Sequence, residues 1–351
     1  LAEDNPPLLY FKLPSAKQMT ESEGEDVGYR AAAWRERSRL SGVLDLLGNV
    51  AAPPEFLQSG GKLDKPYGAK QALRFLYHGG KAAPDSGFAM LRVFEWEKRV
   101  FGLTTELDVV ALDRTRVVKP SEFRGAALAP GEVLPVGFVE PAFAQRYELG
   151  ENGQFTPGAA LRRREVVKLS GASKPGGMLQ SRDGFWVAES NLRMIRPRTS
   201  FPSFATGDRK WVDISIREQS LVAYVGQNPV YVTLVSSGRG GLADPEKVEE
   251  ATARGTFMIF QKDVSSTMDG PDDRADSYSL RDVPFVQYFN KGYALHGTYW
   301  HDEYGKIRSH GCVNLAPIDA AWLFEWTDPV VPPDWHGVIN KERGTVVLVR
   351  P

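Results

Sequence analysis

Residues 210–238 read KWVDISIREQSLVAYVGQNPVYVTLVSSG, and their apolar and polar side chains alternate with a period of two. Such alternation is typical of strands that bury one face, and the GQN at 226–228 supplies the turn between two of them. We therefore predict a β-hairpin, which follows a Pro/Gly/Ser-rich joint at 201–208. Further strands are predicted at 255–261, 283–289, 293–296 and 345–349, and a helix at 318–326.

The first two thirds of the chain has a different pattern. Residues 1–27 are acidic and Pro-rich, and we expect them to be extended or mobile. Apolar residues at helical spacing predict a helix at 28–47, and a shorter helix is predicted at 66–77. Beyond residue 88 the pattern changes to short strands, which we predict at 90–96, 109–112, 115–118, 166–169 and 186–188.

A weak internal repeat lies within these strands. VALDRTRVVKP at 110–120 aligns with VAESNLRMIRP at 187–197, and Ala, Arg and Pro coincide. The repeat favours two copies of a small β-barrel, of which the second resembles a bacterial SH3-like module. We therefore divide the chain into an acidic lead-in with a helical segment (1–88), one or two SH3-like β modules (89–203) and a mainly β C-terminal domain (204–351).

The charge of the chain argues against several classes of protein. Its 43 basic and 44 acidic residues nearly cancel, so no global field attracts nucleic acid. No stretch reaches the roughly 18 apolar residues that a membrane-spanning helix needs. Residues 160–210 are locally basic, which suggests either a surface for an anionic polymer or an ordinary solvated face, and charge runs favour the second.

The histidines and the single cysteine gather near the C-terminus. Four of the five histidines, His296, His301, His310 and His336, lie there, and Cys312 follows His310 by two positions. A free thiol titrates near ~8.5, and a neighbouring imidazole lowers its pKa, so Cys312 is a candidate nucleophile. We expect His301, in a polar WHDEYG segment, to be a surface residue. A zinc site is disfavoured because the spacing matches no common pattern.

The segment from His296 to Ser309-His310-Gly311-Cys312-Val313-Asn314 resembles the signature of the L,D-transpeptidase (YkuD-like) catalytic domains of bacterial cell-wall enzymes. The resemblance also covers the hairpin, the GTF at 255–257 and the PFVQYF…GYALHGT approach, and so spans about 205–351. It implies a mainly β fold in which an L,D-transpeptidase-like β-sandwich follows the SH3-like modules and the N-terminal helical segment.

The resemblance assigns roles to these residues. It makes Cys312 the nucleophile and His296 the general base, oriented through the carbonyl of Gly297, while His310 supports the thiolate. The base role is equally open to His310, although we prefer His296. Ser309 and Asn314 would shape the turn or hold substrate. The remaining assignments are an oxyanion hole from the N–H groups of Gly311 and Cys312, and substrate contacts from Asn314, Gly297, Tyr288, Trp300 and Arg308.

The activity implied is a peptidoglycan L,D-transpeptidase outside the cytoplasm, in the periplasm or cell wall. Its partners would be donor and acceptor stem peptides, its inhibitors carbapenem-type β-lactams, and it would need no cofactor. The alternatives are an L,D-carboxypeptidase, an amidase that cuts wall-attached protein, and a catalytically silent wall-binding protein. The polar segment 264–282 is predicted to be a lid over the acyl-enzyme.

Overall fold

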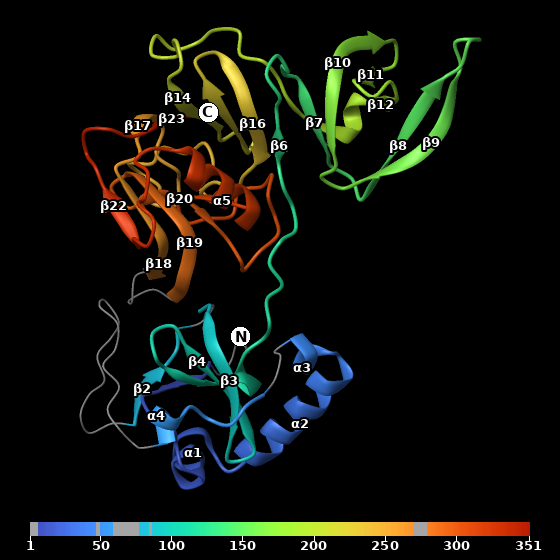
Figure 1. Ribbon diagram of the computed structural model, residues 1–351. Helices are drawn as coiled ribbons and strands as arrows, with labels where there is room; N and C mark the ends of the chain where they lie inside the picture. Colours follow the sequence, from blue (N-terminus) through green and yellow to red (C-terminus); the bar gives the residue numbers. More distant parts are fainter. Residues whose placement is uncertain (1–5, 47–49, 59–76, 84–85, 270–278) are drawn as a thin grey trace. The chain divides into compact units, whose positions relative to one another are not determined.

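The computed structural model describes residues 6–46, 50–58, 77–83, 86–269 and 279–351 (Figure 1). The chain divides into two compact units. The first comprises residues 1–119 with 266–283, and the second comprises residues 120–265 with 284–351. No helix among the described residues is long and apolar enough to cross a membrane.

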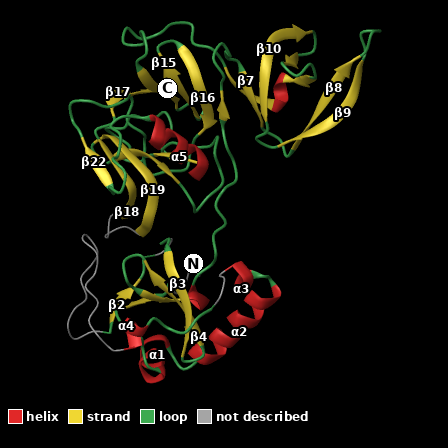
Figure 2. Ribbon diagram, viewed as in Figure 1, coloured by secondary structure: helices red, strands yellow, loops and turns green. Residues whose placement is uncertain are grey.

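The first unit is an antiparallel five-stranded sheet with helices packed on it (Figures 1 and 2). Its strand order is β2 (His78–Lys81), β1 (Leu8–Tyr10), β5 (Val109–Ala111), β4 (Arg99–Thr104) and β3 (Met90–Trp96). Its helices are α1 (Ala16–Glu23), α2 (Val27–Leu40), α3 (Val43–Leu46) and α4 (Glu55–Gln58).

The expectation of an extended or mobile lead-in is wrong for the described part of residues 1–27. Leu8 and Tyr10 on β1, which pairs with both β2 and β5, are buried in the core of this unit, as is Met19 on α1. Ser15 and Gln18 form a reciprocal capping box that starts α1. The sheet also joins strands on both sides of residue 88, so the boundary that we expected there falls within one structural unit.

The predicted helix at 28–47 is found as α2 and α3. The two are separated at Ser41 and Gly42, and Gly42 has a positive φ of 71° that a continuous helix does not tolerate. The helix predicted at 66–77 lies outside the described residues except for its last position. The strand predicted at 115–118 is absent, because the chain there follows the short 3₁₀ turn η1 (Leu112–Arg114) without pairing.

Residues 136–195 form a small antiparallel β module in the second unit. Its seven strands are ordered β13 (Leu192–Ile195), β7 (Val136–Val139), β10 (Val166–Lys174), β11 (Met178–Ser181), β12 (Trp186–Ala188), β8 (Phe143–Leu149) and β9 (Phe155–Arg162). The two copies of the sequence repeat share a strand that leads directly into a 3₁₀ turn. In the first copy β5 leads into η1, and in the second β12 leads into η2 (Glu189–Asn191). That this module is SH3-like stays a prediction.

Two sheets form the C-terminal part of the second unit. One has the order β17 (Gly255–Met258), β23 (Val346–Arg350), β14 (Lys210–Ser215), β15 (Ser220–Val225), β16 (Asn228–Leu234) and β6 (Ala126–Ala127). The other has the order β21 (Val313–Leu315), β20 (Tyr293–Gly297), β19 (Ser279–Asn290), β18 (Gln261–Asp269) and β22 (Gly337–Ile339). Val212 and Ile214 from the first pack against Leu295 and Val313 from the second, which makes a sandwich. The mainly β fold is confirmed.

One strand of this sandwich comes from outside residues 204–351. β6 pairs with β16 through Ala126 and Ala127, and the preceding Gly125 lies so close to the Val232 carbonyl that a side chain could not fit. The N–H of Gly125 donates to Asp319 on helix α5 (Pro317–Trp326). The segment after residue 119 is therefore an integral part of the sandwich.

Both ends of the segment predicted to be a lid are strands. β18 continues to Asp269 and β19 begins at Ser279, so most of the described residues of 264–282 are strand. Within the first unit, the N–H of Arg281 donates to the Gly87 carbonyl, and the Arg281 side chain pairs with Glu106. The centre of the predicted lid, 270–278, lies outside the described residues.

Candidate active site

The motif has two parts, His296 and the segment from Ser309 to Asn314. Parallel pairing of β20 with β21 brings these two parts together. Leu295 pairs with Val313 and His296 with Asn314. Because side chains alternate along a strand, Leu295, Val313 and Leu315 point into the sandwich core while His296 and Asn314 lie on the other face. Cys312, two residues before Asn314, is placed beside that face.

The imidazole of His296 is buried, with 3% of its surface exposed. Its Nδ1 lies 3.0 Å from the Gly297 carbonyl, to which only an Nδ1–H can donate, so Nε2 is left as a proton acceptor. Burial lowers the pKa of His296 to about 4, and the bond to Gly297 opposes that shift. His296 is therefore neutral at pH 7 and has the tautomer that a general base needs.

The turn before Cys312 is held by its own serine and by a glycine. Ser309 Oγ accepts the N–H of Gly311 at 3.1 Å and donates to the carbonyl of Cys312. Gly311 has φ +129°, and a Cβ there would lie 2.9 Å from the ring of Tyr293. Of the two N–H groups predicted to form the oxyanion hole, that of Gly311 is thus already engaged by Ser309.

The thiol of Cys312 is half-buried and donates to the Gly292 carbonyl at 3.7 Å. Burial raises the pKa of Cys312, and the backbone N–H of Ala294 only partly opposes this effect. The sequence had predicted a pKa lowered by a histidine, so the resting state differs from that expectation. The resting group is therefore a thiol rather than a thiolate.

His310 has a different environment from His296. Its ring is partly exposed, its Nε2 contacts the guanidinium of Arg239, and it lies 3.9 Å from Glu250 Oε1. Arg239 also pairs with Glu250 at 2.5 Å and donates its backbone N–H to the Ser309 carbonyl. His310 is therefore part of a charged cluster at the rim of the turn.

The other predicted site residues differ in how closely they approach His296 and the Cys312 turn. Trp300 lies with its ring centroid 5.9 Å from that of His296. Gly297 packs against Pro284 and Ala320. Tyr288 is half-buried on β19 and pairs with Ala294. Arg308 is exposed and pairs with Glu303 at 3.3 Å, so its charge is directed to the loop before the turn.

Sequence reasoning missed several neighbours of the motif. His301 is not a surface residue: it is 9% exposed and its Nε2 lies 2.9 Å from Asn314 Nδ2. Tyr293 lies against Gly311 and near Cys312, and its position three residues before His296 was the available signal. Thr252 donates its hydroxyl to the Gly311 carbonyl at 2.8 Å, a contact that no sequence pattern indicates.

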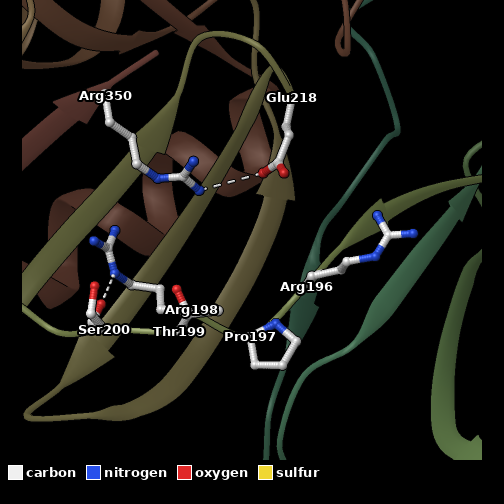
Figure 3. A pocket seen from close by; sticks show the side chains of 7 residues that line it. All are labelled: Arg196, Pro197, Arg198, Thr199, Ser200, Glu218 and Arg350. Carbon is white, nitrogen blue, oxygen red and sulfur yellow. Dashed lines mark hydrogen bonds and ion pairs between the residues drawn. The ribbon is translucent and has the colours of Figure 1, made fainter.

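A cavity of about 220 Å³ lies elsewhere in the second unit and is basic in composition (Figure 3). Its arginines are already paired: Arg198 and Arg350 with the buried Asp213, and Arg196 with Glu189. Other bases of residues 160–210 are paired likewise, namely Lys168 and Arg182 with Glu132 and Arg193 with Glu140. The local basic excess is thus largely neutralised within the fold, which favours the solvated-face interpretation.

No group of three or more His, Cys, Asp or Glu side chains within the described parts of the chain is arranged to hold a metal ion.

The model of the YkuD family, the L,D-transpeptidase catalytic domain, matches residues 209–349. Residues 209–349 therefore resemble an L,D-transpeptidase catalytic domain. The match contains β14 to β22, most of β23, and both His296 and the Ser309–Asn314 segment. It leaves out everything before residue 209, including β6 and the small β module at 136–195. The "Putative L,D-transpeptidase YciB" of Bacillus subtilis (strain 168) is 24% identical over 141 residues, which cover 33% of this chain and 59% of that protein.

Solved structures similar to this chain are also L,D-transpeptidases. The Enterococcus faecium C442S mutant is 23% identical, with 40% of this chain and 50% of that chain covered and a TM-score of 0.31. The Mycobacterium smegmatis enzyme is 19% identical, with coverages of 67% and 100% and a TM-score of 0.33. L,D-transpeptidase 3 of Mycobacterium tuberculosis with a faropenem-derived adduct is 18% identical, with 60% and 78% covered and a TM-score of 0.32.

Proposed function

We propose that this protein is a peptidoglycan L,D-transpeptidase that forms 3-3 cross-links through a thioester on Cys312. The observation that carries the proposal is the L,D-transpeptidase domain match over a segment in which His296 and the Ser309–Cys312 turn share one edge of a sheet. The substrates are stem peptides of the bacterial wall, and the protein acts outside the cytoplasm, in the periplasm or wall.

The protonation states of the two central groups support a general-base mechanism. Nε2 of neutral His296 takes the proton from the Cys312 thiol as sulfur attacks the carbonyl carbon of the third stem residue. The tetrahedral intermediate collapses when its C–N bond breaks, and the imidazolium returns the proton to the departing amine of D-alanine. A thioester remains on Cys312.

An amine from a second stem peptide completes the reaction. It attacks the thioester carbonyl and loses a proton to His296, and the C–S bond breaks to regenerate the thiol. If water attacks instead, the product is a shortened monomer, which is the carboxypeptidase outcome. The Cys312 N–H is our candidate donor to the developing oxyanion, since Ser309 already occupies that of Gly311.

The test is mass spectrometry of disaccharide-tetrapeptide muropeptides incubated with the full chain and, as the matched control, with Cys312→Ser. We expect loss of D-alanine and dimers whose fragmentation shows a 3-3 link, with neither product from the variant. Tripeptide monomer alone would make the protein a carboxypeptidase. No reaction and no Cys312 adduct with a carbapenem would overturn the proposal and favour a silent wall-binding protein.

A further inference from the structure

We propose that His301 is a positioning residue that orients the carboxamide of Asn314, so that the amide NH₂ faces the reacting thioester carbonyl. The inference deepens the proposed function and rests on it. It arises from two buried side chains, one of which we had expected on the surface.

The contacts of His301 determine which of its nitrogens carries the proton. Its Nδ1 accepts the backbone N–H of Glu303 at 3.2 Å, so in the neutral ring the proton resides on Nε2. Burial, followed by the charge of Arg308, lowers the pKa of His301 to about 4, which keeps the ring neutral at pH 7. The Nε2–H is therefore a donor, and it points at Asn314.

With this tautomer, the orientation of the Asn314 carboxamide leaves His301 Nε2–H without an acceptor. Its Nδ2 lies 2.9 Å from His301 Nε2, which sets two donors against each other, while its Oδ1 is buried without a partner among the described residues. Rotating the carboxamide by a half turn lets Oδ1 accept from His301. The NH₂ group then takes the place of the unpartnered oxygen, where a substrate oxygen can accept from it.

The position of Asn314 explains why this orientation matters. It is 2% exposed, pairs in register with His296, and follows Cys312 by two residues on the face turned away from the sandwich core. A carboxamide held there presents its N–H donors on the face of the sheet that also carries His296. Without His301 the same side chain could present its oxygen instead, which would repel the oxyanion.

The loop that carries His301 is itself firmly held. Ser236 Oγ donates to the Glu303 carbonyl at 3.0 Å, and the hydroxyl of Tyr304 donates to the Thr298 carbonyl at 3.2 Å. The preceding β module contributes Arg164, which pairs with Asp302. Since Glu303 supplies the N–H that sets the tautomer of His301, these contacts fix the orientation of Asn314 as well.

Two variants of His301 separate its two hydrogen bonds. In His301→Asn, the side-chain oxygen can replace Nδ1 toward Glu303, but the contact with Asn314 is lost. In His301→Gln, the longer amide can replace the Nε2–H toward Asn314. We expect His301→Asn to lower the rate of Cys312 acylation by stem tetrapeptide about ten- to a hundredfold, and His301→Gln to restore it to within about threefold.

A double-mutant cycle and a spectroscopic measurement decide the proposal. In the Asn314→Ala background, His301→Asn should add little, because the group that it orients is already gone. The ¹⁵N spectrum of histidine-labelled full chain should show His301 as the Nε2–H tautomer, whereas an Nδ1–H tautomer would overturn the proposal. So would independent, multiplicative losses in the cycle, or equal losses in both His301 variants.

The spectrum also separates this proposal from the proposed function. If the wild-type chain is never acylated, the function fails, and the tautomer still decides whether His301 donates to Asn314. Unfolding by urea and alkylation of Cys312 by iodoacetamide, measured for each variant, serve as controls. A variant whose folding has changed would differ from wild type in both measurements.

Discussion

The ring of Tyr293 covers the α-carbon of Gly311, so that a methyl group at position 311 would lie 2.9 Å from the ring edge. Gly311 also has φ +129°, a conformation that other residues rarely adopt. The small residue before Cys312 is thus required by both space and backbone geometry.

Replacing Gly311 by alanine should abolish activity by displacing the Cys312 turn. We expect acylation to fall at least about a hundredfold and the free energy of unfolding to fall by about 1–3 kcal/mol. The control is Gly177→Ala, where φ is +70° and nothing lies within 4 Å of the new methyl group. That variant should lose roughly 1 kcal/mol with unchanged acylation; equal loss of activity in both would contradict the argument.

The reactivity of Cys312 should reflect a raised thiol pKa. Because burial stabilises the thiol over the thiolate, the alkylation rate should be low at pH 7 and still rising above pH 9. Alkylation quenched at set times and followed by intact mass spectrometry gives the rate as a function of pH. The Cys312→Ser variant measures background labelling. A plateau reached below pH 7 would indicate a preformed thiolate and would contradict the general-base mechanism.

The sequence carried the motif of His296 and Cys312, but it did not predict the surroundings of that motif. The Cys312 and His296 assignments came from one contiguous segment, where residue spacing alone carries the resemblance. His301 was misjudged because its neighbours in sequence are polar, although its ring contacts Asn314 on β21 and the adjoining Glu303 carbonyl accepts from Ser236. Such burial depends on sheet pairing, which local composition does not reveal.

The prediction of the fold was likewise limited to features that are local in the sequence. The alternating pattern of residues 210–238 and the GQN turn predicted the hairpin of β15 and β16, since turn and strand signals are local. The turn at 216–219, which separates β14 from β15, was not predicted. By contrast, β1 and β6 have three residues or fewer, and each is stabilised by partners about a hundred residues away. Strands this short carry almost no periodicity, so the acidic and Pro-rich context of β1 determined the prediction.

The buried histidine His296 should make stability depend on pH. Its folded pKa of about 4 lies below the usual 6.5, so between these values the unfolded chain binds a proton that the folded chain does not. Stability should therefore be unaffected above pH 6.5 and decline as the pH falls from 6.5 to 4, by up to about 3 kcal/mol for this group. Urea unfolding of wild type and His296→Gln should show a shallower decline in the variant, and an identical slope would refute the assignment.

Asp319 should be a main determinant of how residues 120–128 attach to the sandwich. Its carboxylate accepts hydrogen bonds from Gly125 N–H at 2.8 Å, from Tyr231 at 2.6 Å and from Thr233. Asp319→Ala leaves three buried donors unpaired and should cost about 3–5 kcal/mol. Glu325→Ala, on the exposed side of the same helix, should stay within about 0.5 kcal/mol; comparable losses in the two variants would contradict this role.

The N-terminal unit should depend on one buried guanidinium. Arg99, with 2% of its surface exposed, pairs with Glu23 on α1 and Asp113 on η1, each at 2.7 Å. Arg99→Met removes the shortest ion pair of both buried carboxylates and leaves Glu23 only the more distant Arg30 and Arg114, at 3.8 and 3.9 Å, so it should destabilise this unit by about 3–5 kcal/mol. Hydrogen exchange should then accelerate in β1 and β4 but not in β14 or β23, while the exposed Arg39→Ala should change neither. Uniform acceleration across both units would mean that the unit does not unfold independently.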